Sequence, residues 1–185
     1  MTMKIRNFTL ADVPKLKEFT DQVIGANYYS TQELTDFYQQ SLKDSHECTL
    51  ILEDEAKAIR GVRITFPPGQ WQHGKGRGLS PALWNTPMNQ VAYFQSLFID
   101  PPLTGQGWGK KMSLQAIDLL KKLGARAVVA HSWKESPHDS SGKYLRALGF
   151  KSVAYHPLYW KDVDYICPHC GKPCLCTAEE MILVL

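Results

Sequence analysis

The sequence predicts an α/β fold in a single domain, on three observations. A chain of 185 residues is long enough for one well-filled core and short for two. Strand-like and helix-like patterns alternate in the order strand, two helices, three strands, helix, strand, helix and two strands. The segment Val91–Ile99 is apolar at nearly every position, which is typical of a strand buried on both faces.

Five elements are expected before residue 67: a strand, two helices and two paired strands. The second helix begins with the capping-box pattern of Ser30 and Glu33, in which each side chain satisfies the other's backbone amide. The first helix has Thr9 or Asp12 as its cap. The expected ranges are Met3–Leu10, Asp12 to about Ile24, Ser30 to about Lys43, Cys48–Leu52 and Ile59–Phe66.

The segment Pro67–Gln90 interrupts this regular pattern. It contains glycines, prolines, Trp71 and Trp84, and a segment of this length is typical of a lid or a flexible excursion. Its run Gly74–Gly78 could cradle a phosphate, but no helix pattern follows. A plain flexible loop is therefore the preferred interpretation.

Six more elements are expected after residue 90. The strand at Val91–Ile99 precedes a helix, a second buried strand, a short helix ended by Gly149, and two final strands. The expected ranges after Ile99 are Gly107–Leu123, Ala127–Ala130, Ser140–Leu148, Lys151–Trp160 and Glu180–Leu185.

Composition limits the classes of partner. The formal net charge is +3, from 21 basic and 18 acidic residues, which gives no argument for a nucleic-acid or membrane partner. No apolar run approaches the roughly 20 residues that span a bilayer, and the N-terminus lacks the apolar stretch of a signal peptide. A cytoplasmic protein is expected, and the oligomeric state is not readable.

The segment Leu97–Lys111 carries the clearest chemistry. A buried strand stops at two prolines, the chain turns on glycines, and a helix begins with lysines in its first turns. Free amides at a helix N-terminus bind anions, and Gly105, Gly107 and Gly109 leave room for a pyrophosphate to approach them. The spacing fails both the Walker loop and the dinucleotide fingerprint. A glycine-rich turn without a ligand remains the alternative.

Two motifs resemble a known family. Leu-x-Ile-x-Pro-x-x-Thr-Gly-x-Gly-x-Gly, from Leu97, is similar to motif A of the GNAT superfamily of acyl-CoA-dependent N-acyltransferases, and Tyr144–Phe150 resembles its motif B. The order of elements over residues 3–160 agrees with that fold. The resemblance implies one domain over residues 1–185 with a mixed, V-splayed central sheet.

The resemblance also implies an acetyl-CoA site. The pantetheine arm would pair like an extra strand with Leu97, Phe98 and Ile99, and the pyrophosphate would lie on the amides from Gly105 to Lys110. Thr104 replaces the usual Gln or Arg of the motif, and His138 stands where the family often has an Asn that touches the cofactor. The expected cofactor-binding residues are Leu97, Phe98, Ile99, Gly105, Gln106, Gly107, Trp108, Gly109, Lys110 and His138.

The family's catalytic tyrosine does not transfer, because Leu145 occupies its position. A group that accepts the amine's proton is still required, since an alkylammonium with a pKa near 10 is mostly protonated at neutral pH. Glu135 is the first candidate base, because burial beside Trp133 would raise its pKa. His131 is the second, and Tyr144 is a candidate proton donor. His138 and Asp139 lie in the same segment, and all five could instead be capping or surface residues.

A cysteine cluster separates the last two strands. Cys167, Cys170, Cys174 and Cys176 supply the four thiolates of a tetrahedral structural zinc, in a Cys-rich loop at 165–178. His169 is a possible substitute ligand. Free or oxidised thiols remain open, as does a redox pair, which would need Cys167 at a helix N-terminus.

The predicted function is transfer of an acetyl group from CoA to a small-molecule or peptide amine. The alternative is a catalytically degenerate CoA-binding sensor, or a module that docks a partner through its zinc loop. Aromatic side chains expected near the acceptor would suit an apolar or cationic amine, unless they belong to the core. They are Trp71, Trp84, Tyr93, Trp133, Tyr155 and Tyr159.

Overall fold

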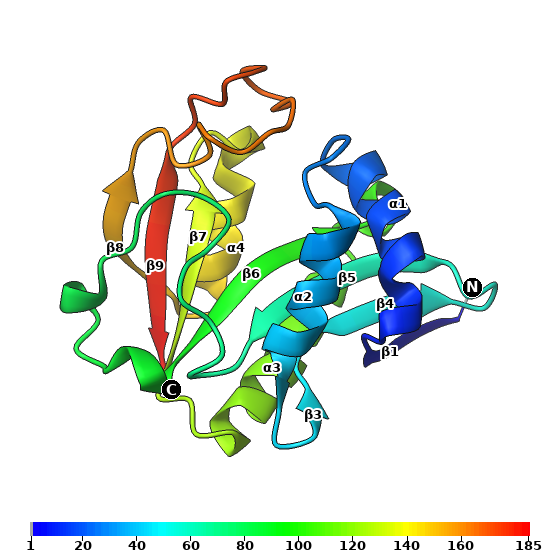
Figure 1. Cartoon of the computed structure of the whole chain (residues 1–185), viewed down its shortest axis with the longest axis horizontal. Coiled ribbons are helices and arrows are strands. Elements are labelled where there is room, and N and C mark those ends of the chain that lie inside the picture. The colour runs from blue at the N-terminus through cyan, green and yellow to red at the C-terminus, as the bar shows by residue number, and fades with distance from the viewer. Residues whose placement is uncertain (1) are drawn as a thin grey trace.

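A seven-stranded mixed sheet crosses the computed structural model, which describes residues 2–185 (Figure 1). Its strand order is β1-β4-β5-β6-β7-β9-β8, and every neighbouring pair is antiparallel except β6 and β7. The strands are β1 Met3–Asn7, β4 Leu50–Asp54, β5 Ile59–Phe66, β6 Val91–Ile99, β7 Ala127–Trp133, β8 Lys151–His156 and β9 Ala178–Val184. A short hairpin, β2 Leu42–Lys43 with β3 His46–Glu47, stands apart from this sheet.

The parallel pair β6 and β7 splits along its length. The two strands pair only from Val91 to Phe94 and from Ala127 to Ala130, although β6 continues to Ile99. They meet near the C-terminus and diverge away from it, so that the sheet opens as a V (Figure 1). A register shift between β5 and β6 leaves Gln95 without a partner in β5 just beyond the last paired residue. The predicted α/β fold with a mixed, V-splayed sheet is confirmed.

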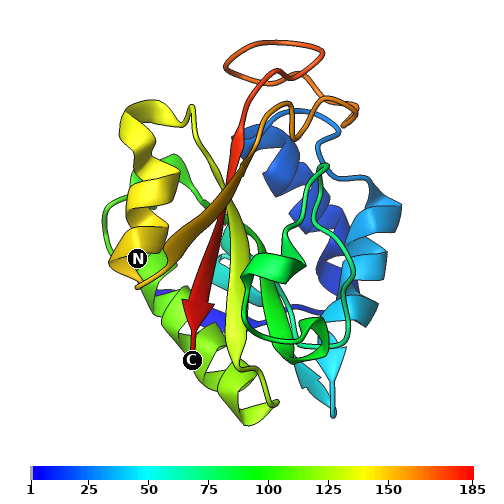
Figure 2. The ribbon, with the colours of Figure 1, turned by 90° about the vertical axis from the view of Figure 1, so that its left-hand side faces the viewer.

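Helices cover both faces of the sheet. The helices α1 Val13–Val23 and α2 Thr31–Ser41 pack on one face, and α3 Trp108–Lys122 and α4 Ser140–Ala147 on the other (Figure 2). The helix α3 buries Met112, Ala116 and Leu120 at a spacing of four residues, which places them on one stripe facing the sheet. The two faces have separate buried clusters, and the V between β6 and β7 is the place where both meet.

Most expected elements occur with small differences at their ends. The capping box of α2 is present: the Glu33 amide donates to Ser30 Oγ at 3.1 Å, and the Ser30 amide donates to Glu33 at 2.9 Å. The strand expected at Lys151–Trp160 ends earlier, at His156. The chain then turns, because Tyr159 and Trp160 are buried in the core and the Tyr159 amide donates to the Cys176 carbonyl. The hairpin of β2 and β3 was not predicted.

The segment Pro67–Gln90 is not a loose excursion. Trp71 and Trp84 are 5 % and 2 % exposed, and their indole N–H groups donate to the Val91 carbonyl and to Glu180. The glycine run lies directly on polar aromatic side chains. A Cβ at Gly74 would come within 2.2 Å of the Tyr93 hydroxyl, and one at Gly76 within 2.2 Å of the Tyr159 carbonyl oxygen. Close packing, rather than flexibility or a phosphate, accounts for these glycines.

Candidate active site

The opening between β6 and β7 holds a cavity of about 490 Å³. Its walls come from both faces of the sheet, so it joins two ends of different character. The end nearer α3 and α4 is lined by Leu97, Thr104, Ser140, Ser141, Tyr144 and Leu145. The opposite end is lined by Val23, Ile24, Tyr28, Trp160, Tyr165, Cys167 and Pro168.

The first turn of α3 presents free backbone amides and follows Thr104, which lines the first end, although residues 105–110 themselves are outside the lining. The helix begins at Trp108, and its first internal bond runs from the Lys111 amide to the Gly107 carbonyl. The amides of residues 108–110 therefore precede the hydrogen-bond ladder of the helix. Such a helix start attracts anions through both its donors and its dipole.

Glycine is required at these positions of the turn for different structural reasons. Gly105 and Gly107 have φ values of +80° and +83°, a conformation that favours glycine, and a Cβ at either would meet no atom within 4 Å. Both thus border open space. A Cβ at Gly109 would lie 2.9 Å from Leu97 Cδ2, so this glycine lets α3 approach β6 closely. The open turn and its free amides fit an anionic group such as the pyrophosphate of CoA.

The candidate catalytic residues lie in different places. Glu135 does not line the cavity: both of its carboxylate oxygens accept from the Thr177 amide at 3.0 Å, which fixes the end of the Cys-rich loop. Tyr144 does line it, but its hydroxyl donates to the Gly109 carbonyl at 3.0 Å and bonds with Ser113 at 2.5 Å. His138 is exposed outside the lining, although Pro137 beside it belongs to the wall.

His131 is the candidate that lines the cavity and also has a polar group near each of its ring nitrogens. Its Nδ1 lies 2.7 Å from the Tyr93 hydroxyl, and its Nε2 lies 3.6 Å from a Glu180 carboxylate oxygen. Glu180 is fully buried on β9, where it also accepts from Trp84 and from the Ser80 amide and pairs with His156 at 2.6 Å. The imidazole therefore has a phenol on one side and a carboxylate on the other.

Burial and charge oppose each other in this group. Burial lowers the pKa of His131 and outweighs the attraction of Glu180, so the imidazole is neutral at pH 7. Burial acts to raise the pKa of Glu180, but its interactions with His131, Trp84 and His156 outweigh burial and lower this pKa to about 2. A neutral imidazole with a charged neighbour is suited to accept a proton.

Sequence reasoning missed Glu180 and Arg63. Glu180 was expected as the first residue of a strand, but its partners come from three segments far apart in the sequence, and no local pattern reveals them. Arg63 lies in β5 and lines the cavity although it is only 3 % exposed. A single arginine in a strand gives no signal of burial.

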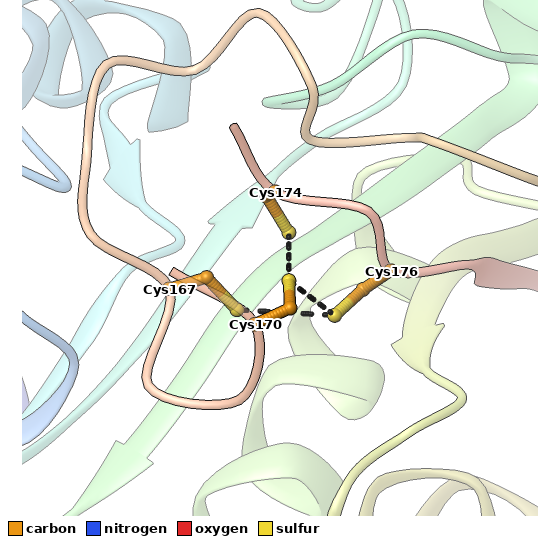
Figure 3. Close-up of side chains that lie close together, drawn as sticks. All are labelled: Cys167, Cys170, Cys174 and Cys176. Atoms are coloured by element: carbon orange, nitrogen blue, oxygen red, sulfur yellow. Dashed lines mark hydrogen bonds between the residues drawn. The ribbon is translucent and has the colours of Figure 1, made fainter. Parts of the chain in front are cut away.

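The four cysteines come together in the Cys-rich loop (Figure 3). Three of their sulfur–sulfur separations are 3.8, 3.9 and 3.6 Å, far longer than a disulfide bond. Tetrahedral zinc with Zn–S bonds of about 2.3 Å has sulfurs about 3.8 Å apart, so the cluster could hold zinc. His169 lies outside it and faces Trp133. Because no helix begins at Cys167, the arrangement expected for a redox pair is absent from this described loop.

The chain is similar to known acetyltransferases. Residues 15–150 match the model of the acetyltransferase (GNAT) family, so the chain belongs to that family. Acetyl transfer is the chemistry of its class. No curated protein matches the chain at a significant level. Within residues 2–185, none of the helices has the length and apolar character needed to cross a membrane.

Solved structures share the fold at low sequence identity. The NatC complex bound to Gag peptide and CoA has a chain 16% identical, with a TM-score of 0.72, covering 100% of this chain and 99% of that one. The ribosomal-protein-S18-alanine N-acetyltransferase from Escherichia coli is 16% identical, with a TM-score of 0.68 and coverage of 99% and 94%. The yncA protein from Salmonella typhimurium, solved with its cofactor acetyl-CoA, is 18% identical, with a TM-score of 0.65 and coverage of 100% and 95%.

Proposed function

We propose that the chain transfers the acetyl group of acetyl-CoA to an amine that enters from the α1 and α2 face. The observation that carries the proposal is the cavity in the splayed sheet, which extends from Thr104, just before the glycine turn and the free amides of α3, to an aromatic chamber. Acetyl-CoA is the acyl-donor substrate, and the thioester would lie where the two ends meet. The family of the chain supports the reaction class.

The donor would be held by β6 and the start of α3. Leu97, Phe98 and Ile99 line the cavity and belong to the part of β6 that does not pair with β7. Their backbone is suited to pair with the amides of the pantetheine arm, and the pyrophosphate would accept from the amides of Gly105, Gly107, Trp108, Gly109 and Lys110. The Gln106 amide, also expected to bind it, already donates to the Leu103 carbonyl at 3.4 Å. Ser140 and Ser141 line the wall where His138 was expected to contribute.

The acceptor end of the cavity favours an amine that carries apolar substituents. Among the residues that line the cavity there is no aspartate or glutamate, and its side walls near α1 are Val23, Ile24 and Tyr28. A polycationic amine would need carboxylates to replace its lost hydration. Of the aromatic residues expected near the acceptor, Trp133 lines the cavity, while most of the others are buried in the core.

We assign His131 as the group that takes the amine's proton, directly or through a water molecule. It lines the cavity, it is neutral at pH 7 because burial lowers its pKa, and Glu180 lies close enough to stabilise the imidazolium that forms. A general base must be unprotonated before it can accept a proton, and the lowered pKa ensures this for His131 at pH 7. Glu135 is less suited, since it does not line the cavity and its carboxylate accepts from the Thr177 amide.

The four cysteines are proposed to hold one structural zinc. Four thiolates leave no open coordination position, so the ion would stabilise the loop and take no part in the chemistry. Cys167 both belongs to the cluster and lines the acceptor end, and Pro168 follows it in the same wall. The zinc would thus fix one side of the acceptor chamber.

The test of the function is turnover of acetyl-CoA with a panel of amines that differ in charge and apolar character. We expect apolar amines to be acetylated faster than polycations. A specific observation keeps one alternative open: Leu145 stands where the family's tyrosine is usual, and the Tyr144 hydroxyl is bound to Gly109. A protein that binds CoA in calorimetry but acetylates no amine would support a CoA sensor instead.

A further inference from the structure

Arg63 is a buried cation that has no anionic partner within residues 2–185. It is 3 % exposed, its guanidinium carbon lies 4.2 Å from the centre of the Phe94 ring, and it lines the cavity. Its one polar contact is the Tyr144 hydroxyl, 3.5 Å from a terminal nitrogen, which is the outer limit of a hydrogen bond. The buried Nε of Arg63 has no hydrogen-bond partner.

Arg60, on the same strand, shows the usual arrangement. Its guanidinium contacts Asp54 at 2.8 Å and Asp100 at 2.9 Å. The Arg60 side chain is also 35 % exposed, so water can solvate part of its charge. Arg63 has no such carboxylate among the residues that line the cavity. Burial lowers the pKa of Arg63, and only Tyr144 opposes this, yet an arginine stays protonated in proteins.

A charge held in this way is costly in the resting protein. An ionised group removed from water needs pairing or hydrogen bonds, and exceptions are concentrated at functional sites. The orientation of Arg63 over Phe94 places the guanidinium beside the last residue at which β6 pairs with β7. This is the point where the two ends of the cavity meet, and where the proposed reaction would generate negative charge.

The anion that the reaction creates there is a thiolate. As the amine lone pair forms the C–N bond, the C–S bond breaks and its electron pair stays on sulfur, while the amine proton passes to His131. The thiolate then takes a proton from solvent. Arg63 is the sole lysine or arginine among the cavity-lining residues, and Leu145 supplies no hydroxyl at the family's tyrosine position.

We propose that Arg63 stabilises the departing CoA thiolate, in place of the tyrosine that this chain lacks. Because the guanidinium has no carboxylate partner among the cavity-lining residues beforehand, its attraction is available when charge develops on sulfur rather than in the resting state. An interaction that strengthens in the transition state accelerates the reaction. The inference rests on the proposed function, since it requires CoA in this cavity.

The experiment measures the thiol pKa of bound CoA from the ultraviolet absorbance of the thiolate, after calorimetry has established saturation. Free thiols ionise near a pKa of about 8.5, and we expect the wild type to lower this by about one unit or more. Arg63→Met should return the bound thiol to the free value, and Arg63→Lys should retain part of the shift. Arg60→Met, on the same strand but outside the cavity, should leave it unchanged.

Two results would overturn the inference. One is a bound thiol in the wild type that ionises like free CoA, a measurement that needs no variant to fold. The other is an equal shift in the wild type and Arg63→Met. If Arg63→Met weakens CoA and acetyl-CoA equally at every pH, Arg63 binds another part of the donor and the assignment is wrong. Failure of the wild type to bind CoA would instead reject the proposed function itself.

Discussion

The hydroxyl of Tyr93 lies 2.7 Å from Nδ1 of His131, beneath the glycine run of the segment Pro67–Gln90. Tyr159 stacks on the same imidazole, with ring centres 4.5 Å apart. The ring is therefore fixed by neutral groups, while the carboxylate of Glu180 lies 3.6 Å from its other nitrogen. This environment favours the neutral imidazole at rest and provides a counter-ion once a proton arrives.

The pH dependence of catalysis tests His131. Because burial lowers its pKa, the acid limb of kcat/KM should have its midpoint below about 6.5, the ordinary histidine value. His131→Gln should reduce kcat/KM by about 10²-fold or more and remove that limb. Since Glu180 raises the pKa of His131, Glu180→Gln should move the limb to lower pH.

The exposed His46 provides the control, and His46→Gln should leave the profile unchanged. Near wild-type rates with the same acid limb in His131→Gln would exclude His131 as the base. Glu135→Gln should have little effect on the profile, because its carboxylate binds the Thr177 amide away from the cavity wall.

The glycine turn is tested by paired substitutions. Gly107→Glu should weaken acetyl-CoA at least about tenfold, since a carboxylate would repel the pyrophosphate at the start of α3. Gly124 has the same left-handed conformation, with φ +85° against +83°, and also faces open space. Gly124→Glu therefore introduces the same backbone strain without the anion site. If the two variants bind acetyl-CoA with equal affinity in calorimetry, the pyrophosphate does not bind at this glycine turn.

Metal content tests the cysteine cluster. Protein purified without added metal should contain about one zinc per chain by elemental analysis. Removal of the metal by a chelator should raise KM for the amine more than KM for acetyl-CoA, because Cys167 belongs to the wall of the acceptor end. Cys174→Ser should behave like the metal-free protein, whereas Cys48→Ala, outside the cluster, should keep its zinc. A zinc-free protein with a mapped Cys167–Cys170 disulfide would contradict the assignment.

Stability above neutral pH tests Glu47. Burial raises its pKa from 4.5 to about 7, against hydrogen bonds from Ser41 and the Thr49 amide, and one of its oxygens has no partner. A raised pKa in the folded state means that its contribution to stability is complete below pH 4.5 and is lost as pH rises through 7. The loss amounts to about 3 kcal/mol at most.

Glu47→Gln keeps a neutral hydrogen-bonding side chain, so its free energy of unfolding should fall less than that of the wild type between pH 5 and pH 8. Urea titrations at the two pH values measure the difference. The exposed Glu18→Gln serves as the control. A wild type and a Glu47→Gln variant with the same pH dependence would show that Glu47 ionises normally.

Local sequence patterns predicted the elements that depend on local physics. The strands β5 and β6 have the bounds expected from their apolar runs, and α2 begins at its capping box because Ser30 and Glu33 satisfy each other's amides. The splay of β6 and β7 came from family resemblance, since periodicity does not report where two strands stop pairing.

The chemistry of the cavity depends on contacts that the sequence does not reveal. Arg60 and Arg63 lie three residues apart on β5, yet in the described part of the chain Arg60 has two carboxylate partners and Arg63 has none. The carboxylates of Arg60 come from β4 and from the end of β6, so only the folded sheet distinguishes the two arginines. Glu135 was predicted as a base because burial beside Trp133 would raise its pKa. In the structure its carboxylate instead accepts a hydrogen bond from the Thr177 amide.

The packing of Gly74, Gly76 and Gly78 on the rings beneath them has a consequence for mutational tolerance. Surface loops usually accept substitutions. Here even a methyl group at Gly78 would come within 2.4 Å of the His156 ring, so alanine should be rejected at every second position. Arg77, whose side chain is largely exposed, should accept many residues. Lys75 should be sensitive as well, because its side chain is only 12 % exposed and pairs with Glu33. A saturation scan of residues 74–78 should thus find Arg77 the most tolerant position, although the whole run belongs to a surface loop.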